Sequence, residues 1–347
     1  MTSNSTFNQE TGASEVAKVY SDAVRDKTVV IVGVSPQSLG ESTAMALASQ
    51  SPGLLVLASR TTLKMSAVAS KIKAQHPDVR LETVEVDLAS LASVREAADR
   101  ISEVVDDKID ILINNAAVVM QTHAYTKEGL EMQFGTNHIG LFLLTNLLMP
   151  KLIRAAEKSP SKGTTRIVNL TSAGHIISPV RFSDYNFTKR PEDIPEQERP
   201  MSRPGVSFDP PPGKTYVPFV AYGQSKTANI LMSVSLSEKL AQEGVRSIAT
   251  HPGSIWTDLS RDLDEEHQNL VSKTGSFWKT LDQGSATTLV AALDPKLSED
   301  TSVIYLSDCQ VAEPAAHAKD PIAAERLWKL SEEIVGQVFA YGDKSRL

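Results

Sequence analysis

A tyrosine and a lysine four residues apart are the side chains of this chain best suited to chemistry. Tyr222 and Lys226 stand at the start of a long helical pattern. Residues at positions i and i+4 share a helix face, so the ammonium group can lie beside the phenol oxygen. A nearby cation favours the phenolate and lowers the phenol pKa from its ordinary value of about 10. The pair therefore predicts a group that can donate and accept a proton.

A second candidate site is the turn between the first strand-like run and the helical pattern that follows it. This turn runs from Gly33 to Gly40. A glycine-bearing turn of this kind brings backbone N–H groups and a helix N-terminus to a pyrophosphate. The usual dinucleotide fingerprint has three glycines, and only two are present here. An ordinary strand-to-helix turn therefore stays open as the alternative.

Composition excludes several classes of protein. The 35 basic and 42 acidic residues give a formal charge of −7, and 41% of the residues are hydrophobic. This balance predicts a globular protein with a substantial core, and the lack of a basic stripe argues against nucleic acid as a partner. The single cysteine, Cys309, rules out an internal disulfide framework, which is typical of a reducing compartment.

The chain also lacks the sequence signals of secretion and of membrane insertion. Its N-terminus has neither the basic region nor the apolar core of a signal peptide. The apolar stretches are shorter than the ~20 residues that a membrane-spanning helix needs. We therefore expect a cytoplasmic protein without a membrane span.

The elements that must position the candidate residues alternate along the chain. Short β-branched runs predict strands at 28–33, 54–58, 83–86, 109–113, 166–170, 246–250 and 302–306. Amphipathic segments near 39–50, 62–75, 90–106, 127–157, 219–243 and 283–293 predict helices between them. Mostly apolar strands joined by helices indicate a doubly wound, Rossmann-type parallel sheet of about seven strands in a three-layer α/β/α domain. Ligands then bind at the carboxyl ends of the strands.

Three stretches depart from this alternation. Residues 1–26 read as a frayed N-terminal extension with a short helix near residues 16–24, so the single domain is expected to cover 27–347. Residues 188–218 contain eight prolines and predict a surface insertion. Residues 258–282 are polar and mixed, follow a strand end, and are expected to form a substrate lid.

Five short motifs occur in an order that identifies a family. They are Asn114-Asn-Ala-Ala117, Thr136-Asn-His-Ile-Gly140, Ile167-Val-Asn-Leu-Thr-Ser172, Tyr222-Gly-Gln-Ser-Lys226 and His251-Pro-Gly-Ser-Ile-Trp-Thr257. With them the chain resembles the short-chain dehydrogenase/reductase (SDR) family, in particular its retinol-dehydrogenase-like branch and the related fungal-type enzymes. The resemblance covers roughly residues 27–310.

The resemblance implies a catalytic set of four residues. Tyr222 is the general acid in carbonyl reduction and the base in the reverse direction. Lys226 lowers the pKa of that phenol and holds the nicotinamide ribose. Ser172 hydrogen-bonds the substrate oxygen, and Asn137 fixes a water that links Lys226 to solvent. A capping serine and a buried, satisfied amide are the alternative interpretations of the last two.

Cofactor choice depends on the end of the second strand. An acid about 20 residues after the glycine loop usually binds the ribose 2′-hydroxyl of NAD, whereas a cation suits the 2′-phosphate of NADP. Here Ser59 and Arg60 occupy that end. A guanidinium makes bidentate, charge-assisted bonds to phosphate, so we expect NADP(H) in preference to NAD(H). A solvated strand-end charge is the alternative for Arg60.

The resemblance extends the cofactor site to further positions. Asp87 matches the contact to the adenine amino group, Asn114 the contact to the adenine ribose, and Ile255 and Thr257 the residues beside the nicotinamide amide and the phosphates. The full set implied to bind the cofactor is Gly33, Ser35, Ser38, Leu39, Gly40, Ser59, Arg60, Asp87, Leu88, Asn114, Asn115, Ala116, Tyr222, Lys226, Pro252, Gly253, Ile255 and Thr257. The glycine loop departs from the family pattern, with Val32 for its leading threonine, an added residue, and Gln37 or Ser38 in place of its central glycine.

Other kinds of site are not favoured. The seven histidines are scattered without metal-ligand spacing, so no metal site is expected. His175, three residues after Ser172, either contacts substrate or is a polar loop residue. Cys309 is interpreted as a packing residue.

These observations favour an NADP(H)-dependent ketoreductase or alcohol dehydrogenase. The alternatives are chemistry without net redox change on the same fold, as in an epimerase, dehydratase or cyclase, and an NADP(H)-binding protein without turnover. Aromatic residues in and around the insertion suggest a fairly hydrophobic small-molecule substrate, namely Tyr185, Phe187, Tyr216, Phe219, Trp256 and Trp278. The family resemblance admits a homodimer or homotetramer formed through the long helices that start near residues 127 and 219.

Overall fold

An extended, mostly parallel sheet forms the centre of the protein. The computed structural model describes residues 1–201, 207–256 and 277–341. Within them eight strands run in the order β3-β2-β1-β4-β5-β6-β7-β8, and all neighbours pair in parallel except β7 and β8. The strands are β1 (Thr28–Val32), β2 (Leu54–Ser59), β3 (Leu81–Glu85), β4 (Ile111–Asn114), β5 (Thr165–Leu170), β6 (Val245–His251), β7 (Tyr305–Ser307) and β8 (Gln310–Val311).

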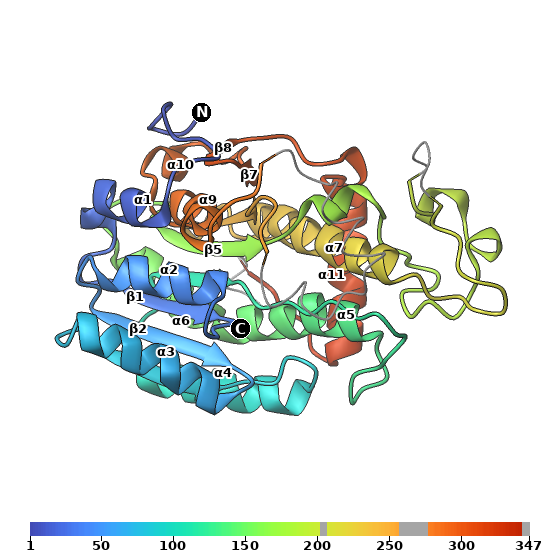
Figure 1. The fold of residues 1–347 in the computed structure, drawn as a ribbon, viewed down its shortest axis with the longest axis horizontal. Helices are drawn as coiled ribbons and strands as arrows, with labels where there is room; N and C mark the ends of the chain where they lie inside the picture. The colour runs from blue at the N-terminus through green and yellow to red at the C-terminus, as the bar shows by residue number, and fades with distance from the viewer. Residues whose placement is uncertain (202–206, 257–276, 342–347) are drawn as a thin grey trace.

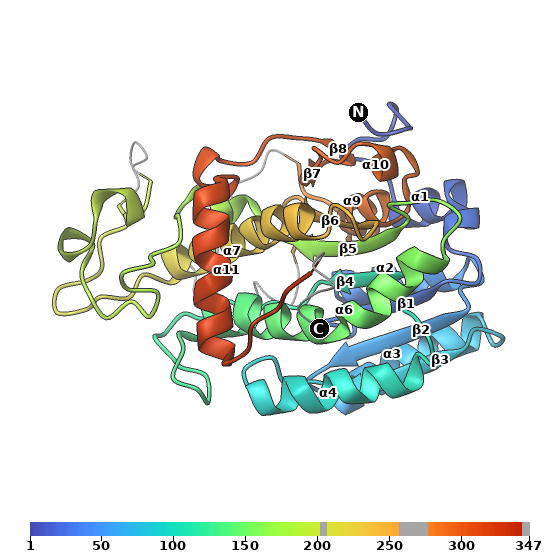
Figure 2. The same cartoon turned by 180° about the vertical axis from the view of Figure 1, so that it is seen from behind.

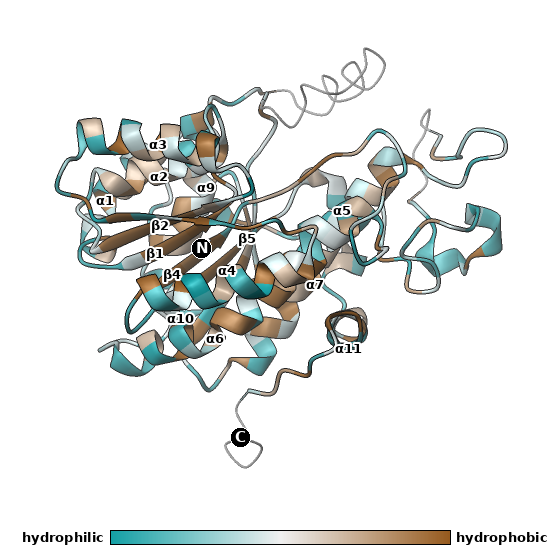
Figure 3. Ribbon diagram, turned by 90° about the horizontal axis from the view of Figure 1, so that it is seen from below, coloured by the Kyte–Doolittle hydropathy of each residue, from teal (hydrophilic) through white to brown (hydrophobic). Residues whose placement is uncertain are grey.

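The central strands are buried on both faces. All four residues of β4 and all six of β5 are buried, and the strands stand out as the hydrophobic centre of Figure 3. A strand covered on both sides needs apolar side chains at successive positions rather than at alternate ones. The continuous Val, Ile and Leu runs therefore identified these strands in the sequence.

Helices cover the sheet on both faces (Figures 1 and 2). One apolar cluster joins the sheet to helices on its first face: α1 (Ala13–Val19), α2 (Leu39–Ala48), α3 (Thr62–Gln75) and α9 (Leu281–Leu293). The other cluster joins it to α4 (Leu91–Val104), α6 (Gly140–Lys158), α7 (Pro218–Lys239) and α11 (Pro321–Val335). The three-layer α/β/α arrangement is the one predicted.

The seven predicted strands are all present, and two features at the ends of the sheet differ from the prediction. The final strand pair turns back on itself, so that the short strand β8 pairs with β7 in the antiparallel direction. The predicted strand at 302–306 begins later, at Tyr305. A two-residue edge strand carries too little sequence to form a recognisable pattern.

The expectation of a frayed N-terminus is wrong. Phe7 is buried in the core, as are Ala13 and Val16 of α1, and α1 packs against α9. The Ser3 hydroxyl donates a hydrogen bond to Asp294 Oδ1 at 2.6 Å. The extension is polar in composition, but its few apolar residues pack against α9 and cover the face of that helix that points away from the sheet.

A long helical stretch leads from the loop after β4 across the domain. It comprises α5 (Met132–Phe134), the π-helical turn η2 (Gly135–Ile139) and α6. By length and composition the stretch Met132–Lys158 could cross a membrane, but 72% of its most apolar window is buried inside the protein. The stretch is therefore longer than the apolar runs seen in the sequence, and it packs as a core helix of the domain.

The described part of the proline-rich insertion projects beyond the start of α7 (Figure 1). It contains the 3₁₀ turns η4 (Pro191–Asp193) and η5 (Glu196–Glu198). A small apolar cluster holds its root, in which Phe187 and Tyr216 are buried. The Tyr216 hydroxyl contacts Glu131 Oε1 at 3.0 Å, and burial raises the pKa of that carboxyl to about 7. Phe187 and Tyr216 therefore stabilise the root of the insertion.

Helix α11 was not predicted and crosses α7 on the outer face (Figure 2). Its start carries ordinary signals, since Asp320 caps it and Pro321 occupies its first turn. Trp328 packs edge-on against Phe142 of α6 at 4.9 Å between ring centroids. The helix therefore covers part of both long helices.

Candidate active site

The predicted site residues gather at one edge of the sheet. Gly33 follows β1, Ser59 ends β2, Asp87 follows β3 and Ser172 follows β5. The chain reverses its direction of winding between β1 and β4, because β2 and β3 lie on one side and β5 to β7 on the other. In open α/β sheets this switch point, at the carboxyl ends of the strands, is where ligands bind.

Helix α7 presents Tyr222 and Lys226 to this edge. Lys226 is 2% exposed, and its Nζ donates a hydrogen bond to the Leu170 carbonyl oxygen at 3.1 Å. The same Nζ lies 5.6 Å from the centroid of the Tyr222 ring. The helix spacing therefore places the Lys226 amine over the ring of Tyr222.

The direction of the Tyr222 pKa shift differs from the sequence-based expectation. Burial raises the pKa of Tyr222 to about 12, and its interaction with Ser172 only partly offsets this. Burial likewise lowers the pKa of Lys226 to about 7. Desolvation is the largest cause of both shifts and favours the neutral form of both groups. The site therefore holds Tyr222 as a protonated phenol, which is the form of a proton donor.

Ser172 is held in place from two sides. It caps the 3₁₀ turn η3 (Ala173–Ile176) by accepting a hydrogen bond from the Gly174 N–H at 3.1 Å. A side chain at Gly174 would come within 3.0 Å of the Tyr222 ring, so glycine permits the close approach of the turn to the phenol. Ser172 therefore caps a turn, as the alternative interpretation expected, and it also lies beside Tyr222.

His175 supports this turn from behind. Its Nε2 accepts a hydrogen bond from the Ala315 N–H at 3.1 Å, which assigns the proton to Nδ1. Nδ1 then donates to the Ser172 carbonyl oxygen at 2.6 Å. The side chain is 2% exposed, and burial lowers its pKa. Both ring nitrogens of His175 are thus bonded to backbone groups, and the residue ties the serine turn to the segment before η7 (Ala316–Ala318).

Asn137 lies in the π-helical turn η2 and ties three segments together. Its Oδ1 accepts from the Val118 N–H at 2.7 Å and its Nδ2 donates to the Val118 carbonyl oxygen at 3.0 Å. Nδ2 also donates to Ser225 Oγ at 3.0 Å, and Ser225 in turn donates to the Tyr222 carbonyl oxygen at 2.7 Å. π-Helical turns are frequent at functional sites. Two partners of Asn137 were not predicted from the sequence: Ser225, which connects it to α7, and Val118, which connects it to the loop after β4.

The turn between β1 and α2 packs tightly against the end of β4. Gly33 has φ of +95°, and a Cβ there would lie 2.4 Å from Ala116 Cα. Asn115 Nδ2 donates to the Gly33 carbonyl oxygen at 2.5 Å. A Cβ at Gly40 would lie 2.2 Å from that same carbonyl oxygen. Both remaining glycines are therefore required by the packing of the turn.

Polar side chains close the rest of this turn. Ser38 caps α2, and its Oγ donates to the Ser35 carbonyl oxygen at 2.6 Å. Gln37 adopts the left-handed conformation with φ of +56°. The left-handed conformation is strained for a residue with a Cβ, whereas glycine adopts it freely. The structure therefore shows how the turn forms without a central glycine.

The neighbouring strand ends supply charged and polar groups. Arg60 is exposed beyond β2, next to the half-buried Ser59. Asp87 is half-buried after β3, and its Oδ1 accepts from the Ala89 N–H at 3.1 Å. Leu88 is buried, and its carbonyl oxygen lies against Gly140. Arg60 and Asp87 are thus open to a ligand at this edge, whereas the Leu88 side chain belongs to the core.

Asn114 is a correction to the predicted set. Its side chain is fully buried and donates to Thr145 Oγ1 at 2.9 Å and to Asn169 Oδ1 at 2.8 Å. A side chain enclosed in this way joins the sheet to α6 and cannot reach an adenine ribose. The ligand role of Asn114 had been implied by the family resemblance alone.

The segment after β6 approaches the same edge. Gly253 has φ of +95°, and a Cβ there would lie 2.6 Å from Lys279 Cε. Ile255 packs against Gly284 of α9. Pro252 is half-buried between them and β6. Thr257 and most of the predicted lid at 258–282 lie outside the described residues.

The donor set at this edge fits a nicotinamide dinucleotide. In its protonated form the buried Lys226 uses one N–H donor on Leu170 and has two left for ribose hydroxyls. The first N–H groups of α2 have no intrahelical acceptors and can face a pyrophosphate. Arg60 offers a cation beyond β2. Within the described part of the chain, no group of three or more His, Cys, Asp or Glu side chains is placed to hold a metal ion.

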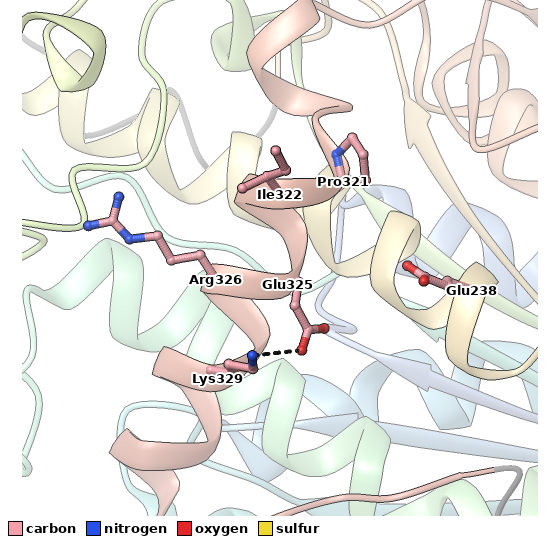
Figure 4. A pocket seen from close by; sticks show the side chains of 6 residues that line it. All are labelled: Glu238, Pro321, Ile322, Glu325, Arg326 and Lys329. Atoms are coloured by element: carbon pink, nitrogen blue, oxygen red, sulfur yellow. Dashed lines mark ion pairs between the residues drawn. The ribbon is translucent and has the colours of Figure 1, made fainter.

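A surface hollow lies elsewhere on the molecule, between α7 and α11 (Figure 4). It contains none of the predicted site residues. Glu325 forms an ion pair there with Lys329 at 3.4 Å. The lining residues are Glu238, Pro321, Ile322, Glu325, Arg326 and Lys329.

Comparisons with known proteins agree with this geometry. A family model described as short chain dehydrogenase matches residues 27–190. Human (Homo sapiens) retinol dehydrogenase 13 is 35% identical over 315 residues, which cover 89% of this chain and 85% of that protein. Oxidoreductase fscI from Fusarium equiseti is 35% identical over 251 residues, which cover 72% of this chain and 95% of that protein.

Solved structures share the fold. A protein from Mycobacterium paratuberculosis is 29% identical with a TM-score of 0.65, over 91% of this chain and 95% of that chain. The NADPH-bound carbonyl reductase from chicken fatty liver is 20% identical with a TM-score of 0.56, over 84% of this chain and 100% of that chain. At this identity the second likeness concerns the fold alone.

Proposed function

The chain belongs to the short-chain dehydrogenase/reductase family and resembles its retinol-dehydrogenase-like branch. On that premise we propose that it is an NADP(H)-dependent carbonyl reductase or alcohol dehydrogenase. The observation that carries the proposal is the meeting of Ser172, Tyr222 and Lys226 at the carboxyl edge of the sheet. A phenol kept protonated beside a serine hydroxyl is suited to a carbonyl oxygen that gains negative charge.

In the proposed reaction each of these side chains has a defined task. When bound, the nicotinamide supplies the hydride that reduces the carbonyl carbon. Ser172 Oγ donates a hydrogen bond that orients the carbonyl oxygen, and Tyr222 Oη transfers its proton to that oxygen as the alcohol forms. Lys226 holds the ribose hydroxyls with its free donors and stabilises the resulting phenolate. Asn137 keeps Ser225, and through it the start of α7, at a fixed distance from the end of β4.

The choice of NADP(H) over NAD(H) rests on Arg60. Its exposed guanidinium beyond β2 can bind a 2′-phosphate through paired N–H groups, and Ser59 adds a hydroxyl beside it. The proposal also includes a small, fairly hydrophobic substrate and a cytoplasmic location.

The test is a screen of ketones, quinones and polyketide-like carbonyls in which loss of NADPH absorbance is followed. The wild-type protein should consume NADPH with at least one class, and Tyr222→Phe should lower kcat by about a hundredfold or more because the proton donor is gone. Full turnover by Tyr222→Phe on the same substrate would overturn the assignment. Turnover of substrate without net NADPH consumption would instead indicate an epimerase, dehydratase or cyclase.

A second measurement addresses the cofactor. Arg60→Ala should weaken binding of NADPH by roughly tenfold and leave binding of NADH unchanged, since only NADPH carries the 2′-phosphate. Equal effects on the two dinucleotides would contradict the assignment of Arg60. Binding of NADPH without any turnover across the screen would favour a nucleotide-binding protein.

A further inference from the structure

The phosphate-binding turn contains a negative charge of its own. Glu41, in the first turn of α2, is 8% exposed, and its Oε2 accepts a hydrogen bond from the Gln37 N–H at 2.6 Å. Its Oε1 accepts from Lys71 Nζ of α3 at 2.8 Å. The carboxylate therefore lies inside the turn at the very helix end that attracts anions, with one cation as its partner.

Other backbone donors of the turn are also taken by the chain itself. The Ser35 N–H points to Ser38 Oγ at 3.3 Å, and the Glu41 N–H points to the same oxygen at 3.2 Å. Pro36 has no N–H group at all. The first-turn N–H groups of Leu39 and Gly40, which have no intrahelical acceptors, remain to face a pyrophosphate.

We propose that Glu41 acts as an internal anion that limits the affinity of this turn for the cofactor pyrophosphate, with Lys71 as its counter-charge. The inference rests on the proposed dinucleotide site. A carboxylate and a pyrophosphate at one helix N-terminus compete for the same partial positive charge, and their like charges repel. Lys71 neutralises part of that repulsion, although 54% of its side chain is exposed to screening solvent.

A purely structural explanation of Glu41 predicts a different outcome. Glutamate and glutamine are both favoured three residues after a capping serine, where their side chains accept from backbone N–H groups. Glu41→Gln therefore keeps an amide oxygen as acceptor for the Gln37 N–H, and it removes the charge together with the acceptor for Lys71 Nζ. If Glu41 only caps the helix, this substitution leaves the affinity for phosphates unchanged.

The experiment measures dissociation constants of the full chain by calorimetry for NADPH and for ADP, which carries a pyrophosphate but no nicotinamide. Glu41→Gln should bind both about fivefold more tightly, as expected for the removal of one unit charge at a partly screened site. Lys71→Gln should bind both more weakly, by about two- to threefold. Both effects should shrink as salt is added. Glu96→Gln on the exposed face of α4 is the matched control for a change of one charge, and it should match the wild type.

The outcomes separate this inference from the proposed function. If NADPH binds to the wild type and Glu41→Gln gives the same dissociation constants, the inference is wrong and the proposed cofactor stands. An equal gain in Glu96→Gln would also overturn it, because the effect would then come from net charge. If neither the wild type nor any variant binds NADPH or ADP, the dinucleotide site itself is refuted. Thermal melts of each variant show whether an altered affinity reflects a folded protein.

Discussion

The two halves of the proposed site are built in opposite ways. At the start of α7, functional side chains are fixed by other side chains and carbonyls, as when Asn137 binds Val118 and Ser225 and when His175 binds the Ser172 carbonyl. At the start of α2, polar side chains of the turn fill the backbone donors that a ligand would use. In the proposed function the first arrangement preorganises groups for a reaction, whereas the second, by our inference, competes with the ligand.

The comparison explains why the chain departs from its family pattern in the turn before α2 and not at the residues proposed for proton transfer. Proton transfer depends on the position of a few atoms, so Ser172, Tyr222 and Lys226 are all present in their expected order. Pyrophosphate binding is spread over several N–H groups and a helix end. A turn can lose its central glycine and still form, because Gln37 adopts the left-handed conformation and the Ser38 and Glu41 side chains bond to the turn backbone.

The largest expected effect comes from Lys226→Met, which should lower kcat by about a hundredfold and also stabilise the protein at neutral pH. The folded-state pKa of Lys226 is about 7, below its ordinary value of 10.5. Between these pH values the unfolded chain binds a proton that the folded chain does not, so wild-type stability rises with pH across this window. Methionine removes the cost of burying the amine, and Asn229 still donates to the Leu170 carbonyl oxygen.

Denaturant unfolding of the wild type and of Lys226→Met from pH 6 to pH 10 checks this prediction. The variant should be more stable by on the order of a few kcal/mol near pH 7 and below. The advantage should shrink as the pH rises toward 10.5. A gap between the two proteins that does not change with pH would show that the amine is not destabilised by burial.

A smaller effect is expected from Asn137→Ala. The substitution leaves both backbone groups of Val118 without their partner and frees Ser225, so it should cost about 2–3 kcal/mol of stability and lower kcat about tenfold. Asn146→Ala on α6 is a matched control, because Asn146 is also buried and hydrogen-bonded but binds Phe142 and Tyr341 away from the site. It should lose stability and retain kcat. Equal losses of kcat in both variants would mean that Asn137 matters only for folding.

The smallest effect is expected at the other half of the site. Gln37→Gly removes the strain of a non-glycine residue at φ of +56° and restores the central glycine of the family pattern. The loss of strain is offset by the greater freedom of glycine in the unfolded chain, so the change in the free energy of unfolding should stay within about 1 kcal/mol. Thermal melts check this value. A loss of several kcal/mol would show that the Gln37 side chain is needed for the turn.

Much of this organisation could be predicted from the sequence. The buried strands were recognisable because a parallel sheet with two covered faces requires unbroken apolar runs. Tyr222 and Lys226 were placed together correctly because the i, i+4 geometry of a helix is local. Of the missed elements, β8 is too short to form a pattern. Helix α11 carried a cap at Asp320 and Pro321 in its first turn, and these signals were overlooked.

By itself, then, the sequence determined the layers, the order of the motifs along the chain and the pairing of phenol and amine on one helix face, since each depends on neighbours in sequence. Tertiary structure alone decided the electrostatics and the partners. Burial, which depends on the whole fold, raised the pKa of Tyr222 when spacing predicted a fall. It also turned Asn114 inward, enclosed Phe187 and Tyr216, and brought Lys71 to Glu41 across two helices. Such contacts join residues far apart in the chain, and no local pattern encodes them.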